Sequence, residues 1–297
     1  MRNSLLMLLA CLSLSSPAWA QSSCPPEGTD LKSLQLLKEQ DFALEEDDTR
    51  NRLAIGLLAC LGERDPELRD GIAYEAITMW LRSNQLDTTL IRRMREKLYD
   101  MLDEEDEAGF RRPFAALVLS EVARTDRIQP WMSPAERDAM VGRATRYLRS
   151  VRDYRGFDDA DGWRHGVAHG ADWLLQLTSN PVLDKQQVQD ILAAVAEQVV
   201  PEASHAYAFG EPGRLVRPVV FAARGGLLSE ADWQAWFAAL PDRLGDESLA
   251  YRDSGWLARR HDLMAFLTSA YLEADQSSDA RVKALKPAIV AALRKVP

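Results

Sequence analysis

The chain has 297 residues, 46% of them hydrophobic, and a formal net charge of −9 at pH 7. This length can bury a large core. The acidic balance, without a lysine- or arginine-rich run, argues against nucleic acid or an anionic membrane surface as a partner. No segment after residue 20 is apolar for long enough to suggest a stable membrane span. No low-complexity linker divides the rest, so 21–297 is predicted to form one domain.

The first twenty residues have the pattern of a signal peptide. Arg2 precedes an apolar run over 5–14, and residues 18–20 (AWA) match a small-residue cleavage site. The run is too short for a permanent span. We therefore predict cleavage after Ala20 and a periplasmic or secreted protein. The alternative is a lipid anchor, since residues 8–11 (LLAC) resemble a lipoprotein processing site.

Export affects which cysteines remain in the mature chain and whether they pair. Cleavage would remove Cys11 and leave Cys24 and Cys60 as the only pair. Oxidising compartments favour disulfides, and an even count fits one bridge. We predict a Cys24–Cys60 disulfide that ties the N-terminal segment to an early helix. The alternative is a buried, free Cys60.

Most of the remaining chain has helical periodicity with recognisable start signals. Residues 65–67 (DPE) place an N-cap acceptor before a first-turn proline, and residues 133–136 (SPAE) form a capping box. Pro201 and Pro241 are predicted to end helices. Helices are expected to begin near Arg52, Asp65, Asp87, Ser133, Gly162, Asp184, Ser229, Gly255 and Asp279.

The pattern predicts an all-α fold. No run of strictly alternating β-branched residues suggests a sheet, and about twelve helices of similar length follow one another across short turns. Consecutive antiparallel helix pairs with a spacing near forty residues fit an α-solenoid of the HEAT or armadillo kind. A closed α/α toroid is the alternative.

A histidine-containing stretch is the most distinctive part of the sequence. On a helix over 162–177, the side chains of His165, His169, Asp172 and Gln176 fall within about 60° of one another. This stripe has no lysine, arginine or glutamate, which are the usual residues of an exposed face. Three interpretations stay open: the lining of a polar groove, a metal site, and a solvent-exposed face.

The chemistry of this stretch limits the metal interpretation. Imidazoles at i and i+4 with a carboxylate one turn on, as in His165, His169 and Asp172, can hold Zn²⁺. Gly166 stands where an H-E-x-x-H protease needs its general base, so that activity is excluded. Gly166 and Gly170 also permit close approach of a ligand or of another backbone.

A second polar segment, 204–215, is the longest non-periodic stretch of the second half. It places His205, Tyr207, Glu211 and Arg214 just before a helix. Ordered loops of this kind often carry function. The simpler alternative is a local ion pair between Glu211 and Arg214 at the helix start.

These segments together resemble the signature of a bacterial family, the domain of unknown function 2785 family. Four segments carry the resemblance, the histidine stretch most specifically: 162–172 (GWRHGVAHGAD), 110–119 (FRRPFAALVL), 210–215 (GEPGRL) and 266–271 (FLTSAY). The chain departs from the family pattern at Pro113, Ala115, Pro212 and His261. The resemblance covers roughly 50–275 and implies a helical-repeat-like fold, without an established activity.

Two kinds of function fit these residues. The first is a binding module whose groove holds a small polar ligand, a glycan or a peptide, without a cofactor. Its predicted lining is Trp163, His165, His169, Asp172, Glu211 and Arg214. The second is an enzyme that uses the same groove, either with a metal ion or without one.

The enzyme hypothesis takes a metal form and a metal-free form. In the first, His165, His169 and Asp172 hold Zn²⁺, and its water attacks an ester or phosphate. In the second, His205, Tyr207 and Arg214 act on a glycan. The pair of His261 and Asp262 resembles HD-type phosphohydrolases, but only the terminal helix follows it, without the distant aspartate which that motif needs.

Overall fold

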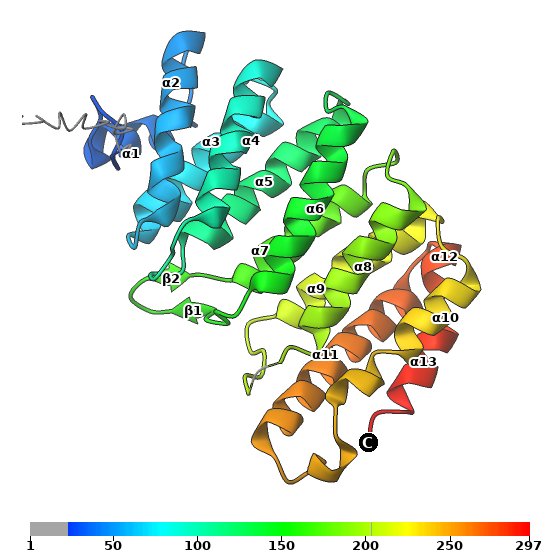
Figure 1. The fold of residues 1–297 in the computed structure, drawn as a ribbon. Coiled ribbons are helices and arrows are strands. Elements are labelled where there is room, and N and C mark those ends of the chain that lie inside the picture. The colour runs from blue at the N-terminus through cyan, green and yellow to red at the C-terminus, as the bar shows by residue number, and fades with distance from the viewer. Residues whose placement is uncertain (1–22, 203) are drawn as a thin grey trace, which may run out of the picture.

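The computed structural model describes residues 23–202 and 204–297, and these are mostly helical (Figure 1). The all-α prediction is confirmed. The predicted signal peptide, 1–20, lies outside the described residues. The α-helices are α1 (Leu31–Glu39), α2 (Asp47–Leu57), α3 (Glu75–Arg82), α4 (Thr88–Asp103), α5 (Arg111–Ile128), α6 (Pro134–Ser150), α7 (Gly166–Thr178), α8 (Lys185–Val199), α9 (Glu211–Gly225), α10 (Glu230–Ala238), α11 (Ser254–Gln276), α12 (Ala280–Lys283) and α13 (Lys286–Leu293).

Shorter elements complete the described chain. A π-helix, Glu67–Tyr74, leads directly into α3, and 3₁₀ turns cover Leu58–Gly62, Pro241–Leu244 and Glu247–Leu249. Among the described residues, none of the helices has the length and apolar character needed to cross a membrane.

The helices pack in a regular order. The helices α3, α5, α7, α9 and α11 form one row, here called the odd row, in which each helix packs on the next. The helices α4, α6 and α8 each pack on the odd-row helix that follows them in the chain. Figure 1 shows this array running from α1 at one end to α13 at the other. The odd row therefore brings together residues that are about forty positions apart.

The start signals read from the sequence form the expected caps. The Asp87 side chain accepts from the Leu90 N–H at 2.8 Å, and capping boxes open α6 at Ser133, α8 at Asp184 and α10 at Ser229. Each side chain satisfies a backbone N–H that the first helical turn leaves without a partner. These four starts are confirmed.

The last predicted helix is divided. The sequence suggested one helix over 279–296, whereas α12 ends at Lys283 and α13 begins at Lys286. Pro287 explains the break, because its ring would clash with the carbonyl of Lys283 and it has no N–H to donate. Pro287 is tolerated in the first turn of the new helix.

The predicted helix over 162–177 begins later than expected. Strands β1 (Phe157–Asp158) and β2 (Gly162–Trp163) form a small antiparallel hairpin, which the sequence did not suggest, and α7 begins at Gly166. Asp158 forms the turn, since its side chain accepts from the N–H groups of Ala160 (2.9 Å) and Asp161 (2.7 Å). This local side-chain bonding competes with the helix.

The two glycines of this stretch serve helix packing. A Cβ added at Gly170 would lie 3.0 Å from Leu148 and 3.1 Å from Tyr147, both on α6. Gly166 faces the same Tyr147, whose hydroxyl donates to the Gly166 carbonyl at 3.2 Å. The close approach that the sequence suggested is therefore to a neighbouring helix.

The predicted disulfide between Cys24 and Cys60 is present. Cys60 is fully buried in the 3₁₀ turn after α2, and the bridge closes a separation of 36 residues. It joins the N-terminal segment to the first helices of the array.

Candidate ligand-binding site

Helix α7 lies in the middle of the odd row, between α5 and α9. Its polar stripe is consequently largely enclosed: His169 is 6% exposed and Asp172 is 9% exposed. Gln176, one turn further, is half-buried and accepts from Arg127 of α5 at 3.1 Å. The interpretation of this stripe as a plain solvent-exposed face is therefore wrong.

His169 is held as a neutral imidazole. Its Nδ1–H donates to the Pro113 carbonyl of α5 at 3.2 Å, and its ring meets the Phe114 ring edge-on at 5.1 Å. Burial, with a smaller effect of the nearby His165, lowers the pKa of His169 to about 3. Its Nε2 therefore remains an acceptor.

His165 precedes α7 in a left-handed conformation, with φ of 59°. Its ring stacks on Trp163 at 4.5 Å, and Nε2–H donates to the Phe209 carbonyl at 3.1 Å. Burial lowers the pKa of His165, although Glu211 acts in the opposite direction. Both histidines of the stripe are thus uncharged near neutral pH, with ring centroids 5.9 Å apart.

Glu211 and Arg214 come to the stripe from α9. Glu211 is 3% exposed; one carboxylate oxygen lies 3.7 Å from His165 Nε2, and the other accepts from the Phe209 N–H at 2.9 Å. Arg214 binds Asp172 through two N–H groups, with Nε to Oδ1 at 3.0 Å. Arg214 therefore pairs across the helix interface, and the local pair with Glu211 is not formed among the described residues.

The structure thus brings the six predicted residues into one cluster. Trp163 stacks on His165, whose ring lies beside the ring of His169 and the carboxylate of Glu211. Arg214 binds Asp172 and lies near enough to both histidines to contribute to lowering their pKa values. The cluster joins the end of the β1–β2 hairpin to the facing surfaces of α7 and α9.

The described residues contain no group of three histidine, cysteine, aspartate or glutamate side chains placed to hold a metal ion. Asp172 is engaged by Arg214, and the two histidines each direct a ring nitrogen to a backbone carbonyl. The three predicted zinc ligands, His165, His169 and Asp172, therefore lie close together without forming a ligand set.

His205 and Tyr207 lie in a different environment from Arg214. The His205 ring stacks on Tyr154 at 5.4 Å, and the Tyr207 hydroxyl is bonded to Gln198. In the described part of the chain neither side chain has a hydrogen bond or ion pair to Arg214. The acid–base set suggested for a metal-free glycan enzyme is not assembled.

Sequence reasoning missed the arginines that extend the cluster along the odd row. Arg82 of α3 binds Glu121 of α5 through two hydrogen bonds at 2.9 and 2.6 Å. Arg217 of α9 lies 3.8 Å from Asp172, while Arg124 and Arg127 follow Glu121 on α5. We call Arg82, Glu121, Arg124, Arg127, Asp172, Gln176, Arg214 and Arg217 the arginine stripe. The sequence signal that could have found them is the spacing of Glu121 and Arg124, which lie three positions apart and therefore on one face of a helix.

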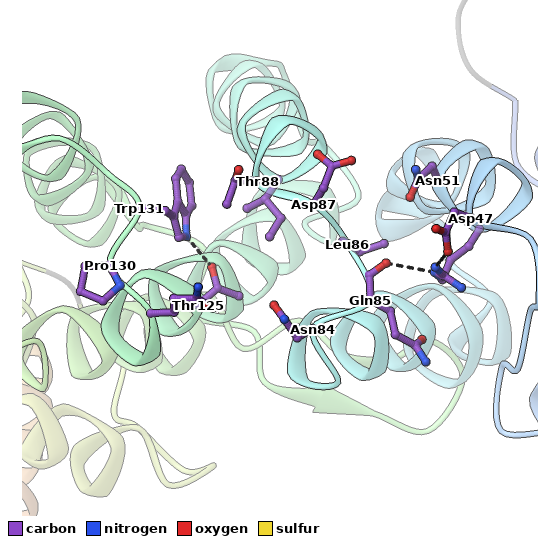
Figure 2. Close-up of a pocket in the computed structure, with 13 residues that line it drawn as sticks. Asp47, Asn51, Asn84, Gln85, Leu86, Asp87, Thr88, Thr125, Pro130 and Trp131 are labelled. Atoms are coloured by element: carbon purple, nitrogen blue, oxygen red, sulfur yellow. Dashed lines mark hydrogen bonds and ion pairs between the residues drawn. The ribbon is translucent and has the colours of Figure 1, made fainter.

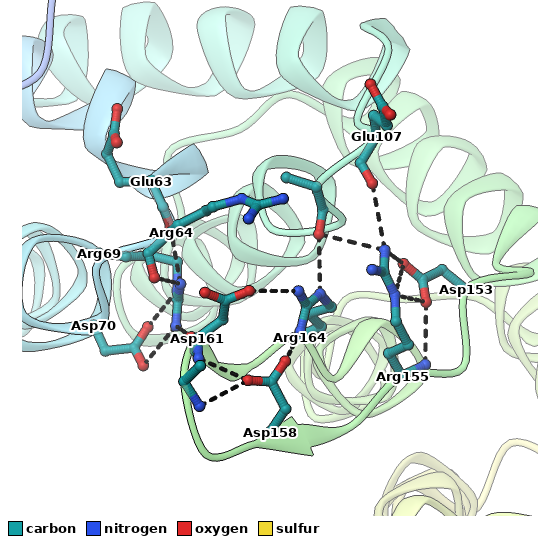
Figure 3. Close-up of polar contacts among 12 residues, drawn as sticks. Glu63, Arg64, Arg69, Asp70, Glu107, Asp153, Arg155, Asp158, Asp161 and Arg164 are labelled. Atoms are coloured by element: carbon teal, nitrogen blue, oxygen red, sulfur yellow. Dashed lines mark hydrogen bonds and ion pairs between the residues drawn. The ribbon is translucent and has the colours of Figure 1, made fainter.

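A network of buried arginines holds the hairpin beside the cluster (Figure 3). Arg164 donates to the Ala108 carbonyl at 2.9 Å and to the carboxylates of Asp158 at 2.7 Å and Asp161 at 3.0 Å. Arg69, from the π-helix, donates to the Asp161 carbonyl at 2.9 Å. The hairpin is therefore bound to two other parts of the chain.

A cavity of about 590 Å³ lies at a different place, between the α3–α4 and α5–α6 turns (Figure 2). Its lining includes Arg50, residues 84–88 and residues 129–131. Arg50 donates to the Gln85 carbonyl at 3.1 Å, and the Trp131 indole donates to Thr125 at 2.9 Å. None of the six predicted site residues lines this cavity.

The fold and the cluster define the class: an all-α protein in which helical hairpins support a polar stripe. The family described as "Protein of unknown function (DUF2785)" matches residues 98–272, more than half of the chain. The chain belongs to this family. The match is narrower than the expected 50–275 but includes all six residues of the cluster. No curated protein and no solved structure matches the chain.

Proposed function

We propose that this chain is an exported binding module that holds a small anionic ligand on the arginine stripe. Residues 21–297 form its single domain, an open α-solenoid of the HEAT or armadillo kind. The order of packing in the odd row supports this arrangement, as does the position of α1 and α13 at opposite ends of the array in Figure 1. The arginine side chains of the stripe stay accessible in this row: those of Arg82 and Arg217 are 53% and 54% exposed, and that of Arg214 is 34% exposed.

The observation that carries this proposal is the excess of arginine on the stripe. Five arginines accompany two carboxylates, Glu121 (3% exposed) and Asp172 (9% exposed), which Arg82 and Arg214 cover. Arg124 and Arg127 have no carboxylate partner among the described residues. Burial and the neighbouring Arg124 lower the pKa of Arg127. An anion would relieve this repulsion.

The chemistry of guanidinium groups indicates the ligand class. Arginine presents planar pairs of N–H donors that match carboxylate and phosphate oxygens. The neutral imidazole of His169 adds an acceptor for a ligand hydroxyl or N–H. The basic stripe contrasts with the net charge of −9 of the whole chain, which indicates a local rather than a general affinity for anions.

We expect calorimetric titration at low salt to detect binding of at least one di- or tricarboxylate or sugar phosphate. Arg124→Gln and Arg217→Gln should each weaken that binding by about tenfold or more, because a charge-assisted hydrogen bond contributes about 1.5–3 kcal/mol. Arg93→Gln, an exposed arginine on α4, is the matched control and should leave the affinity unchanged. Absence of binding by all anionic probes, or equal weakening by the control, would contradict the proposal.

Export is tested separately. The mature protein recovered from a periplasmic or secreted fraction should begin at Gln21 and contain no free thiol, because Cys24 and Cys60 are joined. Intact mass spectrometry before and after reduction and alkylation measures both properties. An uncleaved chain, or one that begins at a lipid-modified Cys11, would overturn the predicted cleavage after Ala20.

A further inference from the structure

Three exposed aromatic rings meet where the β1–β2 hairpin faces the segment before α9. Phe157 is 43% exposed, and Trp163 and Phe209 are each 38% exposed. The Trp163 ring centroid lies 5.1 Å from that of Phe157 and 5.9 Å from that of Phe209. We call these three residues the aromatic shelf. A contiguous exposed cluster of this kind indicates a binding surface.

The shelf borders a cavity of about 380 Å³. Phe157 and Phe209 line it together with the rings of Tyr154 and His205, which stack on each other with an interplanar angle of 12°. This volume is in the range of small-molecule sites and too small for a helix. The cavity therefore suits one or two rings of a small molecule.

The walls also carry polar groups. Arg155 and Asp158 line the cavity and have side chains that are 51% and 46% exposed. Arg155 is already paired with Asp153, with Nε to Oδ1 at 2.8 Å. A guanidinium and a carboxylate near one another offer both donors and acceptors without a strong net charge.

Buried contacts of the hairpin fix the position of the aromatic shelf. The buried Arg164 binds both ends of the hairpin turn, through Asp158 and Asp161, and its guanidinium lies 4.3 Å from the Phe110 ring centroid. A Cβ added at Gly156 would clash with the Phe209 ring, so the hairpin and the ring fit closely. The exposed rings are thus preorganised, which lowers the entropic cost of binding.

We propose that the aromatic shelf and its cavity bind a neutral saccharide, with one sugar ring stacked on Trp163 or Phe209. The faces of sugar rings carry C–H groups that pack against aromatic rings, and sugar hydroxyls both donate and accept hydrogen bonds. Arg155 and Asp158 can satisfy those hydroxyls. This site adjoins the cluster of predicted site residues through the stacking of Trp163 on His165, but it does not rest on the proposed function.

Other occupants fit the cavity less well. An apolar side chain of a peptide would desolvate Arg155 and Asp158 without replacing their bonds to water, which is costly. An anion would meet two arginines, Arg155 and Arg164, that are already paired with the carboxylates of Asp153 and Asp158. A neutral, hydroxyl-rich ring avoids both penalties.

The test uses neutral tetrasaccharides as probes: cellotetraose, maltotetraose, xylotetraose and chitotetraose. We expect at least one to change the tryptophan fluorescence of the full protein in a saturable way, and calorimetry to give the same affinity. Trp163→Ala and Phe209→Ala should each weaken binding by at least tenfold. Trp163→Phe should keep most of the affinity and lose most of the fluorescence change.

Tyr251→Ala is the matched control, because Tyr251 is a 61% exposed aromatic residue that packs on Trp256 and does not line the cavity. Thermal melts of each variant show whether it is folded. The proposal is overturned if no probe binds, if the Trp163→Ala and Phe209→Ala double variant binds as the wild type does, or if only peptides compete for the shelf. Because these probes are uncharged, such a failure leaves the titrations with anions unaffected.

Discussion

Replacement of Arg69 by methionine should lower the free energy of unfolding by about 3–5 kcal/mol. The Arg69 side chain is fully buried and donates to the carbonyls of Glu63 (2.9 Å), Arg64 (3.1 Å) and Asp161 (2.9 Å), and to the Asp70 carboxylate (2.8 Å). Methionine would fill part of the volume but would leave these acceptors without a donor.

The neighbouring Arg155 provides the control. Figure 3 shows both arginines in the same polar network, but the Arg155 side chain is 51% exposed. Its replacement by methionine should cost less than about 1 kcal/mol, since water can take over its bonds. Urea unfolding of both variants measures the difference. Equal costs would show that burial of Arg69 does not contribute the expected stability.

Hydrogen exchange gives a second measurement for Arg69→Met. The bond from Arg69 to the Asp161 carbonyl joins positions 92 residues apart, and Asp161 lies in the hairpin turn. Faster exchange should therefore appear at the amides of Gly162 to Arg164 at denaturant concentrations where the array remains folded. The hairpin carries Trp163, so this bond links stability to the candidate site.

Sequence reasoning succeeded where the determining interactions are local. A capping residue such as Ser133 acts on an N–H three positions away, and the period of the apolar residues reflects the face that each helix buries. The stripe of His169, Asp172 and Gln176 follows from the same period, and the structure places all three on one side of α7.

Non-local bonds explain what the sequence did not indicate. The hairpin depends on Arg164 reaching the Ala108 carbonyl 56 residues away, and on Arg69 reaching the Asp161 carbonyl 92 residues away. Periodicity assigns a charged residue to the surface by default, so it cannot reveal a buried arginine. For the same reason, periodicity could not identify Asp172 as the partner of Arg214, because this pair depends on the packing of α7 on α9.

Asp262 combines deep burial with an unpaired oxygen. It is 1% exposed; Oδ1 accepts from the Tyr207 N–H at 2.8 Å, and Oδ2 has no hydrogen-bond partner among the described residues. Burial, with a smaller effect of Glu211, raises the pKa of Asp262 to about 7, although the Tyr207 N–H acts in the opposite direction. The charged side chain that acts on its pKa is Glu211 of α9.

A raised pKa makes this carboxyl group unfavourable for folding as the pH increases. Well below pH 3.8 the group is protonated in both states, so it causes no difference. Between pH 4 and pH 7 the unfolded chain loses the proton while the folded protein keeps it, and stability falls. Above pH 7 the loss is complete and amounts to about 4 kcal/mol for a shift from 3.8 to about 7.

Asp262→Asn removes this pH dependence, because the amide stays neutral and its oxygen can still accept from Tyr207. We expect the difference in unfolding free energy, variant minus wild type, to rise by about 4 kcal/mol between pH 4 and pH 7.5. Urea unfolding across this range measures it. Asp232→Asn is the control with the opposite sign. Hydrogen bonds from Lys185 and Ser229 hold the pKa of the half-buried Asp232 carboxyl at about 2, so the difference in unfolding free energy, variant minus wild type, should not rise with pH. Parallel pH profiles for Asp262→Asn and the wild type would show that Asp262 is ionised in the folded protein, and that its environment is more polar than its burial implies.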